Sequence, residues 1–355
     1  MKTNLIYILG MMCLSGTVSA QTTVNYTEFE QKVLDYSQTL KQSVSQRTAM
    51  QKAMKAAKTA FFPAVDATGS YQYRINKYDM DFGGMAVPME HDSYSAEVGV
   101  VQPIYAGGSI YHTYKASQIQ SQIADKSVDL TTDNLIYAAE ASYWGTAAQK
   151  EMYKTMCQYV EIISQLTKVL QDKYDDGYIS KTDLIQMQTR LKEAELQRSS
   201  SYQSYQIALQ NMNVLMGLEP DKEVGLVDSI FVELPLPAYV GADAALNVRP
   251  DYAISQLDVD YQKRQVKLAA AKYNPSLSIG FKETWGTQML NISGETMFNS
   301  NVYASVKLPL FHWGARFKST AAQKAILLGK QYALQDKQDQ ITKEVAKAWT
   351  SLTEN

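Results

Sequence analysis

The sequence has few of the residues that carry most catalytic and metal chemistry. Its 355 residues include only 2 cysteines and 3 histidines. His91, His112 and His312 are scattered along the chain without the spacing of metal ligands. The paired acids Asp175 and Asp176 lie in a turn between helical segments, where capping in solvent is far commoner than acid–base work. We therefore expect neither an enzyme nor a metal or other cofactor.

Cysteine is too scarce to form a disulfide framework. Cys13 lies in the N-terminal segment that we expect to be removed, which leaves Cys157 alone in the mature chain. Because Cys157 falls within a helical pattern, a buried structural thiol is expected more than a reactive one.

Charge of one sign and long apolar runs are also lacking. The net charge is −2 and the pI is about 6.0, so the composition shows no basic field for nucleic acid and no polybasic cluster for a membrane surface. No stretch of about 20 apolar residues follows the first 20 residues, which excludes a conventional transmembrane helix. Any span of a membrane must then be made of strands.

The first twenty residues have the three parts of a secretory signal. Lys2 precedes an apolar run from Leu5 to Leu14, and Val18-Ser19-Ala20 matches a small-residue cleavage site. We expect an exported protein that is cleaved after Ala20.

An internal duplication organises the rest of the chain. A strand-like run begins at Pro63, a second ends at Gly107-Gly108, and a long helical pattern follows. The same order recurs between Pro275 and Gly314. Each unit reads helix, strand, loop, strand, helix, which indicates a repeated architecture.

The four strand-like runs alternate strictly between apolar and polar residues. Odd positions from Val65 to Tyr73 are mostly apolar or aromatic and their neighbours are polar, and each run is about ten residues long, as a tilted transmembrane strand requires. A soluble antiparallel sheet has the same period and is the alternative. Four strands cannot close a barrel, so three copies with about twelve strands are expected. The candidate lumen-lining side chains are Arg74, Glu97, Lys282 and Lys307, with Tyr303 beside them.

The helical patterns are longer than a globular domain needs. The pattern from Ser109 to Tyr174 predicts a helix of roughly 100 Å, and an apolar seam from Leu184 to Leu215 predicts a returning coiled-coil arm. A third helix is expected from Arg249 to Tyr273, with Pro250 in its first turn. The segment between the second and third helices is expected to form a belt beside the middle of the long helix.

With these elements identified, the chain resembles the TolC family of outer-membrane efflux proteins over nearly its whole mature length. Singly the matching segments are weak, and their order and spacing make the resemblance specific. They are Gln102-Pro103-Ile104-Tyr105 with Gly107-Gly108, Gly177 to Leu184, Arg249-Pro250-Asp251-Tyr252, and Leu308-Pro309-Leu310-Phe311 with Gly314.

The resemblance implies an α+β membrane protein of the outer membrane with its helices in the periplasm. Each protomer would bring long helical hairpins and four transmembrane strands to a homotrimer with one twelve-stranded barrel. It also implies passive conduction of small molecules or proteins, in a tripartite efflux or type I secretion system with a periplasmic adaptor and an inner-membrane pump. No cofactor and no nucleic acid are implied, and outer-membrane lipid surrounds the strands.

The same resemblance assigns roles to the turn after the long helix. Gly177, Tyr178, Ile179 and Ser180 correspond to the tip that contacts the adaptor, and Thr182 with Asp183 to links that hold such channels shut. Asp183 can equally be an acid that favours the start of a helix.

The resemblance divides the chain into a signal peptide (1–20), a first repeat (21–220), an equatorial linker (221–248) and a second repeat (249–355). The second repeat stops within its long helix, so we expect that this chain alone does not form a sealed, gated channel and that the seam from Leu184 to Leu215 is left partly uncovered. The alternative to a channel is a periplasmic adaptor or another coiled-coil scaffold.

Overall fold

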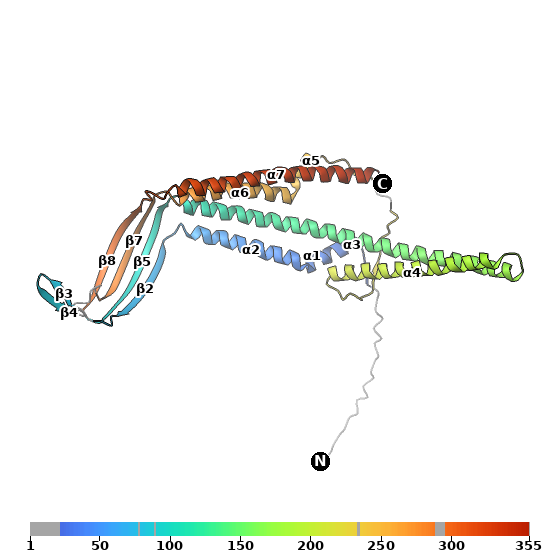
Figure 1. Ribbon diagram of the computed structural model, residues 1–355, viewed down its shortest axis with the longest axis horizontal. Helices are drawn as coiled ribbons and strands as arrows, with labels where there is room; N and C mark the ends of the chain where they lie inside the picture. Colours follow the sequence, from blue (N-terminus) through green and yellow to red (C-terminus); the bar gives the residue numbers. More distant parts are fainter. Residues whose placement is uncertain (1–21, 77–78, 89, 233–234, 288–294, 355) are drawn as a thin grey trace, which may run out of the picture. The chain divides into compact units, whose positions relative to one another are not determined.

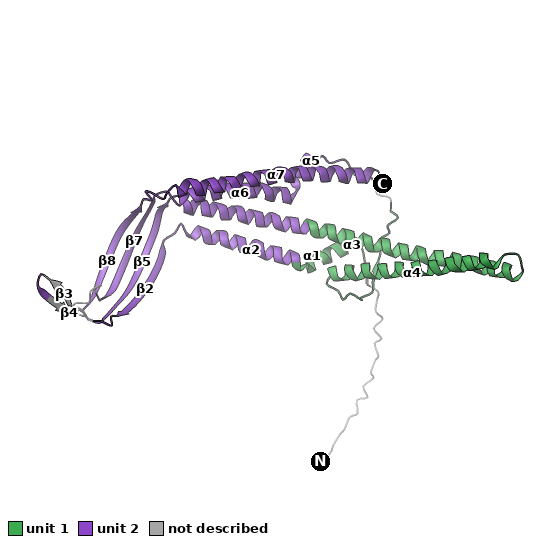
Figure 2. Cartoon of the chain, viewed as in Figure 1, with its two compact units in different colours: residues 1–38, 133–235 green, residues 39–132, 236–355 purple. Residues whose placement is uncertain are grey.

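The computed structural model describes residues 22–76, 79–88, 90–232, 235–287 and 295–354. Figure 1 shows its helices and strands, and Figure 2 its two compact units. The first unit comprises residues 1–38 and 133–235, and the second comprises residues 39–132 and 236–355. The expected signal peptide lies outside the described residues. Within the described ranges, no helix is both long and apolar enough to cross a bilayer.

The second unit contains a four-stranded antiparallel sheet. Its order is β2-β5-β7-β8, so two strands from each sequence repeat lie side by side (Figure 1). All four predicted strands are confirmed, and together with the long helices they give the predicted α+β class. The strands are β2 (Ala64–Tyr73), β5 (Asp92–Ala106), β7 (Ser276–Thr287) and β8 (Thr296–Lys307).

The register collects the polar positions of all four strands on one face of the sheet. Thr68 lies opposite Glu97, and Glu97 lies opposite Thr284 on the next strand. Thr284 in turn lies opposite Asn299. Because directly paired residues point to the same face, the alternation seen in each strand becomes one polar and one apolar surface.

Two features of the strands were not predicted. The segment between β2 and β5 contains a short hairpin of β3 (Asp79–Phe82) and β4 (Met85–Pro88), which turns at Gly83-Gly84. The pairing of β5 with β7 also shifts register after Pro103. A proline lacks the N–H that a sheet ladder needs, and the bulge accommodates it.

Helices of the second unit adjoin both ends of the strand pairs in sequence. α2 (Gln38–Thr59) precedes β2, and α3 (Ser109–Asp175) follows β5 and continues into the first unit. α5 (Ala242–Val248) and α6 (Pro250–Ala271) precede β7, and α7 (Ala315–Thr353) follows β8 and lies beside α6 (Figure 1). The predicted bounds of the long helix are confirmed to within one residue.

The first unit is a helical hairpin with a small core at its base. α4 (Lys181–Leu215) returns along α3, and α1 (Tyr26–Tyr36) packs near the end of α4. The chain start and part of the linker form a parallel pair, β1 (Thr22–Val24) with β6 (Val224–Leu226), which sequence alone did not predict. Thus a segment of the linker does pack beside the middle of α3.

Tyr143 of α3 is the largest fully buried side chain in this core. Its hydroxyl lies 2.7 Å from the Asp228 carboxylate and 3.1 Å from the carbonyl oxygen of Val24. Burial and the hydrogen bond to Asp228 raise its pKa, so the phenol stays protonated. One residue of α3 thereby ties together the chain start and the linker.

The expectation of a partly uncovered seam is met in part. Leu184, Ala194 and Met212 are buried, and Thr146 of α3 donates a hydrogen bond to the Ala208 carbonyl. The returning arm therefore covers part of its seam against α3, while Met187, Leu191 and Leu215 stay half-buried. Exposed apolar side chains of the hairpin include Ile185, Leu196, Ile207 and Val214 of α4 and Ile162 and Val169 of α3.

Candidate channel wall and docking tip

The polar face of the sheet carries one ion pair near its middle. Lys282 Nζ lies 2.9 Å from a carboxylate oxygen of Glu97, and Thr284 Oγ1 donates to the same oxygen over 3.3 Å. The two charged residues are diagonal neighbours, because Lys282 lies opposite Gly99. An exposed pair of this kind contributes under about 1 kcal/mol. Its main effect is on the charge of this face.

The other two candidate lumen residues do not join that pair. Arg74 lies one residue beyond β2, where its backbone N–H donates to the His91 carbonyl over 2.6 Å. Lys307 is the last residue of β8 and pairs with Ser276 at the opposite end of the sheet. The structure therefore brings together Glu97 and Lys282 only. Whether the four line a lumen stays a prediction.

The other face of the sheet is apolar and exposed. The side chains of Val65, Val98 and Val302 are 67%, 50% and 83% exposed. Glu283 is a charged exception on this face, and its carboxylate accepts a hydrogen bond from Ser300 of the neighbouring strand. A large apolar surface of this kind requires a partner or a lipid environment.

A defined turn joins α3 to α4 at the end of the hairpin. Gly177 has φ +81°, its N–H donates to the Tyr174 carbonyl, and the N–H of Tyr178 donates to the Lys173 carbonyl. These two bonds are the pattern of a Schellman motif, in which glycine adopts the left-handed conformation at little cost. The turn leaves Tyr178 80% exposed and Ile179 half-buried.

The next helix begins with a capping box. Ser180 Oγ accepts from the N–H of Asp183, and the Asp183 carboxylate accepts from both the N–H and the hydroxyl of Ser180. The interpretation of Asp183 as a helix-start acid is therefore confirmed. Thr182 is exposed beside it, and the gating role of both residues stays a prediction.

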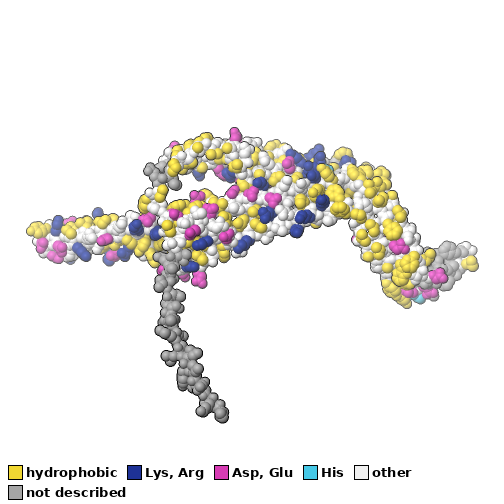
Figure 3. Space-filling view, turned by 180° about the vertical axis from the view of Figure 1, so that it is seen from behind, with side chains coloured by type: hydrophobic (Ala, Val, Ile, Leu, Met, Phe, Trp, Pro, Cys, Tyr) yellow, Lys and Arg dark blue, Asp and Glu magenta, His cyan; other side chains and the backbone are white. Residues whose placement is uncertain are grey.

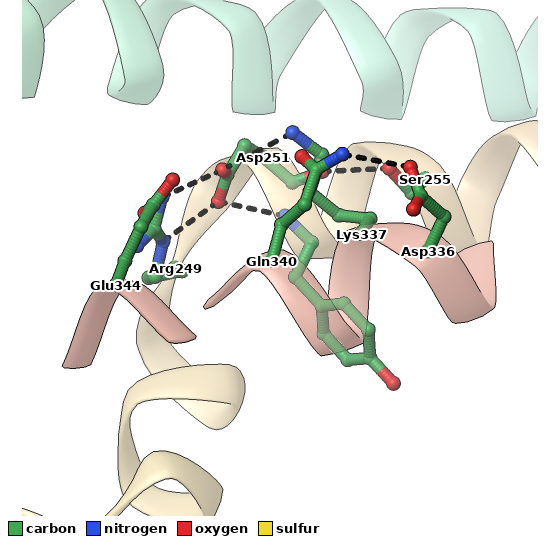
Figure 4. A network of polar contacts seen from close by, with 8 residues as sticks. Arg249, Asp251, Ser255, Asp336, Lys337, Gln340 and Glu344 are labelled. Carbon is green, nitrogen blue, oxygen red and sulfur yellow. Dashed lines mark hydrogen bonds and ion pairs between the residues drawn. The ribbon is translucent and has the colours of Figure 1, made fainter. Parts of the chain in front are cut away.

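A polar network explains why Arg249 and Asp251 flank a proline. Two guanidinium nitrogens of Arg249 lie 3.1 and 2.9 Å from the two Asp251 oxygens, and a third lies 2.6 Å from Glu344 of α7 (Figure 4). Lys337 of α7 lies 3.8 Å from Asp251. The start of α6 is thereby joined to α7. The sequence showed the Arg-Pro-Asp segment but not its α7 partners, which lie two turns apart on one face of that helix.

The charges of this network shift the protonation of its members. Burial acts to raise the pKa of Asp251, but the hydrogen bonds and charge of Arg249, with the charge of Lys337, outweigh it and hold that pKa below its ordinary value. Hydrogen bonds to Asp251 and Glu344 raise the pKa of Arg249. Both groups are therefore charged at neutral pH.

Replacing Asp251 tests the energetic role of the network. We expect Asp251→Asn to lower the free energy of unfolding by about 2 kcal/mol at pH 7, because a charge-assisted bidentate pair is lost. Since the folded pKa is depressed, this contribution is present above the unfolded pKa of about 3.9 and is lost as pH falls through the folded value. Denaturant unfolding at pH 7 and pH 3 would measure it.

Lys192→Ala serves as the control, because Lys192 forms an exposed pair with Glu195 one turn away on α4. Its effect should stay within about 0.5 kcal/mol. An Asp251→Asn protein as stable as the original at neutral pH would contradict the role given to the network.

Cys157 is half-buried, so the expectation of a buried thiol is met only in part. No group of three or more His, Cys, Asp or Glu side chains suited to a metal ion occurs in the described part of the chain.

The sheet has one polar face and one exposed apolar face, and its strands are long enough to span a membrane. Together with the long helices that adjoin it, this sheet defines the class as an α+β membrane protein. The family model described as "Outer membrane efflux protein" matches residues 30–218 and 241–354. The chain belongs to the outer membrane efflux protein family. It is accordingly a protein of the cell outer membrane whose helical part lies in the periplasm.

Known proteins with related sequences and folds agree with this class. The chain is 22% identical over 268 residues to the alkaline protease secretion protein AprF of Pseudomonas aeruginosa, which covers 73% of this chain and 55% of AprF. The chain thus spans about half the length of that curated relative.

Solved structures show the same fold. The CmeC outer membrane channel of Campylobacter jejuni matches with a TM-score of 0.73 and 16% identity, over 88% of this chain and 67% of CmeC. The outer membrane protein VceC of Vibrio cholerae matches with a TM-score of 0.76 and 15% identity, over 92% of this chain and 78% of VceC.

Proposed function

We propose that this chain is one protomer of a trimeric outer-membrane channel that conducts small molecules or proteins passively from the periplasm to the exterior. The observation that carries the proposal is the four-stranded sheet with one polar face, one exposed apolar face and no strand paired beyond β2 or β8 among the described residues. An open sheet edge is not tolerated in lipid, so the edges must pair with other copies. Three sheets of four strands give about twelve, within the range of such barrels.

In this arrangement the polar face lines the lumen and the apolar face contacts lipid. Arg74, Glu97, Lys282 and Lys307 then face the aqueous path, where charges of both signs give a wide pore little selectivity. The turn at Gly177, Tyr178, Ile179 and Ser180 docks to a periplasmic adaptor that connects to an inner-membrane pump. Conduction of this kind needs no cofactor and no catalytic group.

Family membership and the name of AprF support a secretion or efflux role over that of an adaptor or scaffold. The division into two repeats separated by an equatorial linker at 221–248 remains part of the proposal. The compact units cut the chain differently, because α3 contributes to both. The closing links at Thr182 and Asp183 are likewise proposed, and the capping box is compatible with them.

Chemical labelling of single cysteines tests the two faces of the sheet. In a Cys157→Ser background, Thr68→Cys and Ser70→Cys should react with a membrane-impermeant maleimide, because they lie on the polar face. Ala67→Cys and Ala96→Cys, on the apolar face, should react at least tenfold more slowly in the membrane. The readout is the rate of mass shift in outer-membrane preparations.

Detergent-unfolded samples of the same variants provide the control, because all four cysteines should then react at similar rates. Faster labelling at Ala67 and Ala96 than at Thr68 and Ser70 in membranes would contradict the assignment of the polar face to the lumen and the apolar face to lipid. Heat-sensitive trimers in the outer-membrane fraction, and channel conductance in planar bilayers, test the assembly itself.

A further inference from the structure

The ends of the helices that adjoin the sheet carry cations and no acids. On α2 these are Lys52, Lys55 and Lys58, which lie within two turns of the end of the helix at Thr59. No Asp or Glu occurs between Asp35 and Asp66. These three lysines are exposed, and none forms an ion pair with another described residue.

The other three helices repeat the pattern. Arg264, Lys267 and Lys272 lie within or just beyond the last two turns of α6, and Arg316 and Lys318 lie in the first turn of α7. The nearest acids on these helices are further from the sheet, at Asp260 and Asp336.

On α3, Lys115 lies within two turns of the helix start, and the first acid is Asp125. We call these nine cations the basic collar. Figure 3 shows dark blue side chains gathered on the helices beside the predominantly yellow sheet.

Part of the basic collar surrounds a groove between α3 and α6. The groove has a volume of about 400 Å³, and its charged lining residues are Lys115, Asp260, Lys263, Arg264 and Lys267. Lys263 is paired with Asp260 at 2.8 Å, whereas Arg264 and Lys267 have no acidic partner in the described ranges. Burial, and then the charges of Lys267 and Arg264, lower the pKa of nearby His112, which is a sign of a positive field.

Exposed aromatic side chains lie between the basic collar and the sheet. Phe62 is 60% exposed in the segment before β2, and Phe311 and Trp313 are 69% and 84% exposed after β8. Along the chain from the sheet into the helices, apolar strand residues are therefore followed first by exposed aromatic residues and then by cations. Aromatic belts mark the level of lipid headgroups, and basic residues beyond them attract anionic headgroups.

We propose that the basic collar binds the anionic phospholipid headgroups of the periplasmic leaflet. This inference rests on the proposed trimer, which also explains why another copy of the chain cannot be the partner. Symmetric copies would bring cations of the same sign to the same level, so they cannot neutralise one another. A bilayer that already covers the apolar face of the sheet places phosphates next to the collar. The sequence contains no polybasic run at these positions, because the nine cations of the basic collar come from four separate helices.

The test is the lipid preference of the full chain in bilayers of phosphatidylcholine with phosphatidylglycerol. Spin-labelled lipids report the relative association constant of each headgroup at the protein surface. We expect a preference of several-fold for phosphatidylglycerol, and at least a threefold loss in Lys58→Gln/Lys272→Gln/Lys318→Gln, because these lysines supply part of the positive charge that attracts anionic headgroups. Raising the salt to about 1 M should have the same effect.

The matched control removes three lysines near the hairpin tip, in Lys168→Gln/Lys173→Gln/Lys181→Gln, and should keep the preference. An equal preference for both lipids in the original protein, or an unchanged preference in the collar variant, overturns the inference. Loss of the preference in about 10 mM inorganic phosphate at constant ionic strength would assign the collar to small anions and also overturn it.

Trimer content and conductance are measured on the same samples. A conducting trimer without lipid preference refutes only the basic collar, whereas a chain that forms no trimer refutes the proposed channel and the collar together.

Discussion

Tyr178→Glu is expected to lower efflux at least tenfold while leaving the trimer intact. Tyr178 is 80% exposed at the hairpin tip, and only its backbone N–H takes part in the Schellman turn. A glutamate can keep that backbone bond, but it places a charge at the centre of the surface that we propose docks to the adaptor. An uncompensated charge buried in an interface costs several kcal/mol, which is more than tenfold in affinity. Export should be measured in the native host after replacement of the gene.

Two further variants separate docking from folding. Gln186→Glu adds the same charge to an exposed position of α4 two turns from the tip, and should leave export unchanged. Gly177→Glu strains the left-handed position as well as adding the charge, so it should lose both export and some stability. Normal export by Tyr178→Glu trimers would show that the tip is not the docking surface.

The elements predicted well from sequence are those with many repeats of one period. The long helix was placed to within one residue because 67 residues of helical pattern contain no proline. The four strands are predicted because about six to ten residues of each alternate between apolar and polar side chains. Elements of three to seven residues were missed, since pairs such as β1 with β6 are too short for a period to show. β1 and β6 form where Val24, Val224 and Leu226 pack in the core around Tyr143.

Contacts of the candidate site were predictable from sequence only where both partners lie within one short stretch of the chain. The start of α4 is local, so the sequence indicated Asp183 as a helix-start acid, but it did not predict the capping box that Asp183 forms with Ser180. The contact between Glu97 and Lys282 depends on the register between β5 and β7, which alternation does not fix. In the same way, the contacts of Glu344 and Lys337 with the Arg249 segment depend on the packing of α7 beside α6, which the sequence pattern does not specify. The basic collar was not predictable either, because it forms only where the ends of four helices lie at the same level beside the sheet.

Gly107→Ala is expected to destabilise the second unit by about 2–5 kcal/mol. Gly107 has φ +63°, which strains any residue with a Cβ by about 1 kcal/mol or more. An added Cβ would also lie 2.6 Å from the carbonyl oxygen of Ala271 and 2.9 Å from Asn274 Cβ. The Asn274 amide donates to the Gly107 carbonyl over 2.8 Å, so the end of α6 cannot withdraw without losing that bond. Overpacking against backbone adds a further 1–3 kcal/mol or so.

Substitutions at two other glycines of the same unit separate the cost of backbone strain from the cost of overpacking. Gly108 has φ +88°, but the nearest atom to an added Cβ is in the His112 ring at 3.6 Å, so Gly108→Ala should cost only the strain of about 1–2 kcal/mol. Gly329 is exposed within α7 with nothing within 4 Å, and Gly329→Ala should stabilise by up to about 1 kcal/mol because alanine favours helix. The temperature at which trimers dissociate should therefore fall most for Gly107→Ala, less for Gly108→Ala and not at all for Gly329→Ala. Equal effects at Gly107 and Gly108 would mean that backbone strain alone accounts for this turn, and that its packing against the end of α6 contributes nothing.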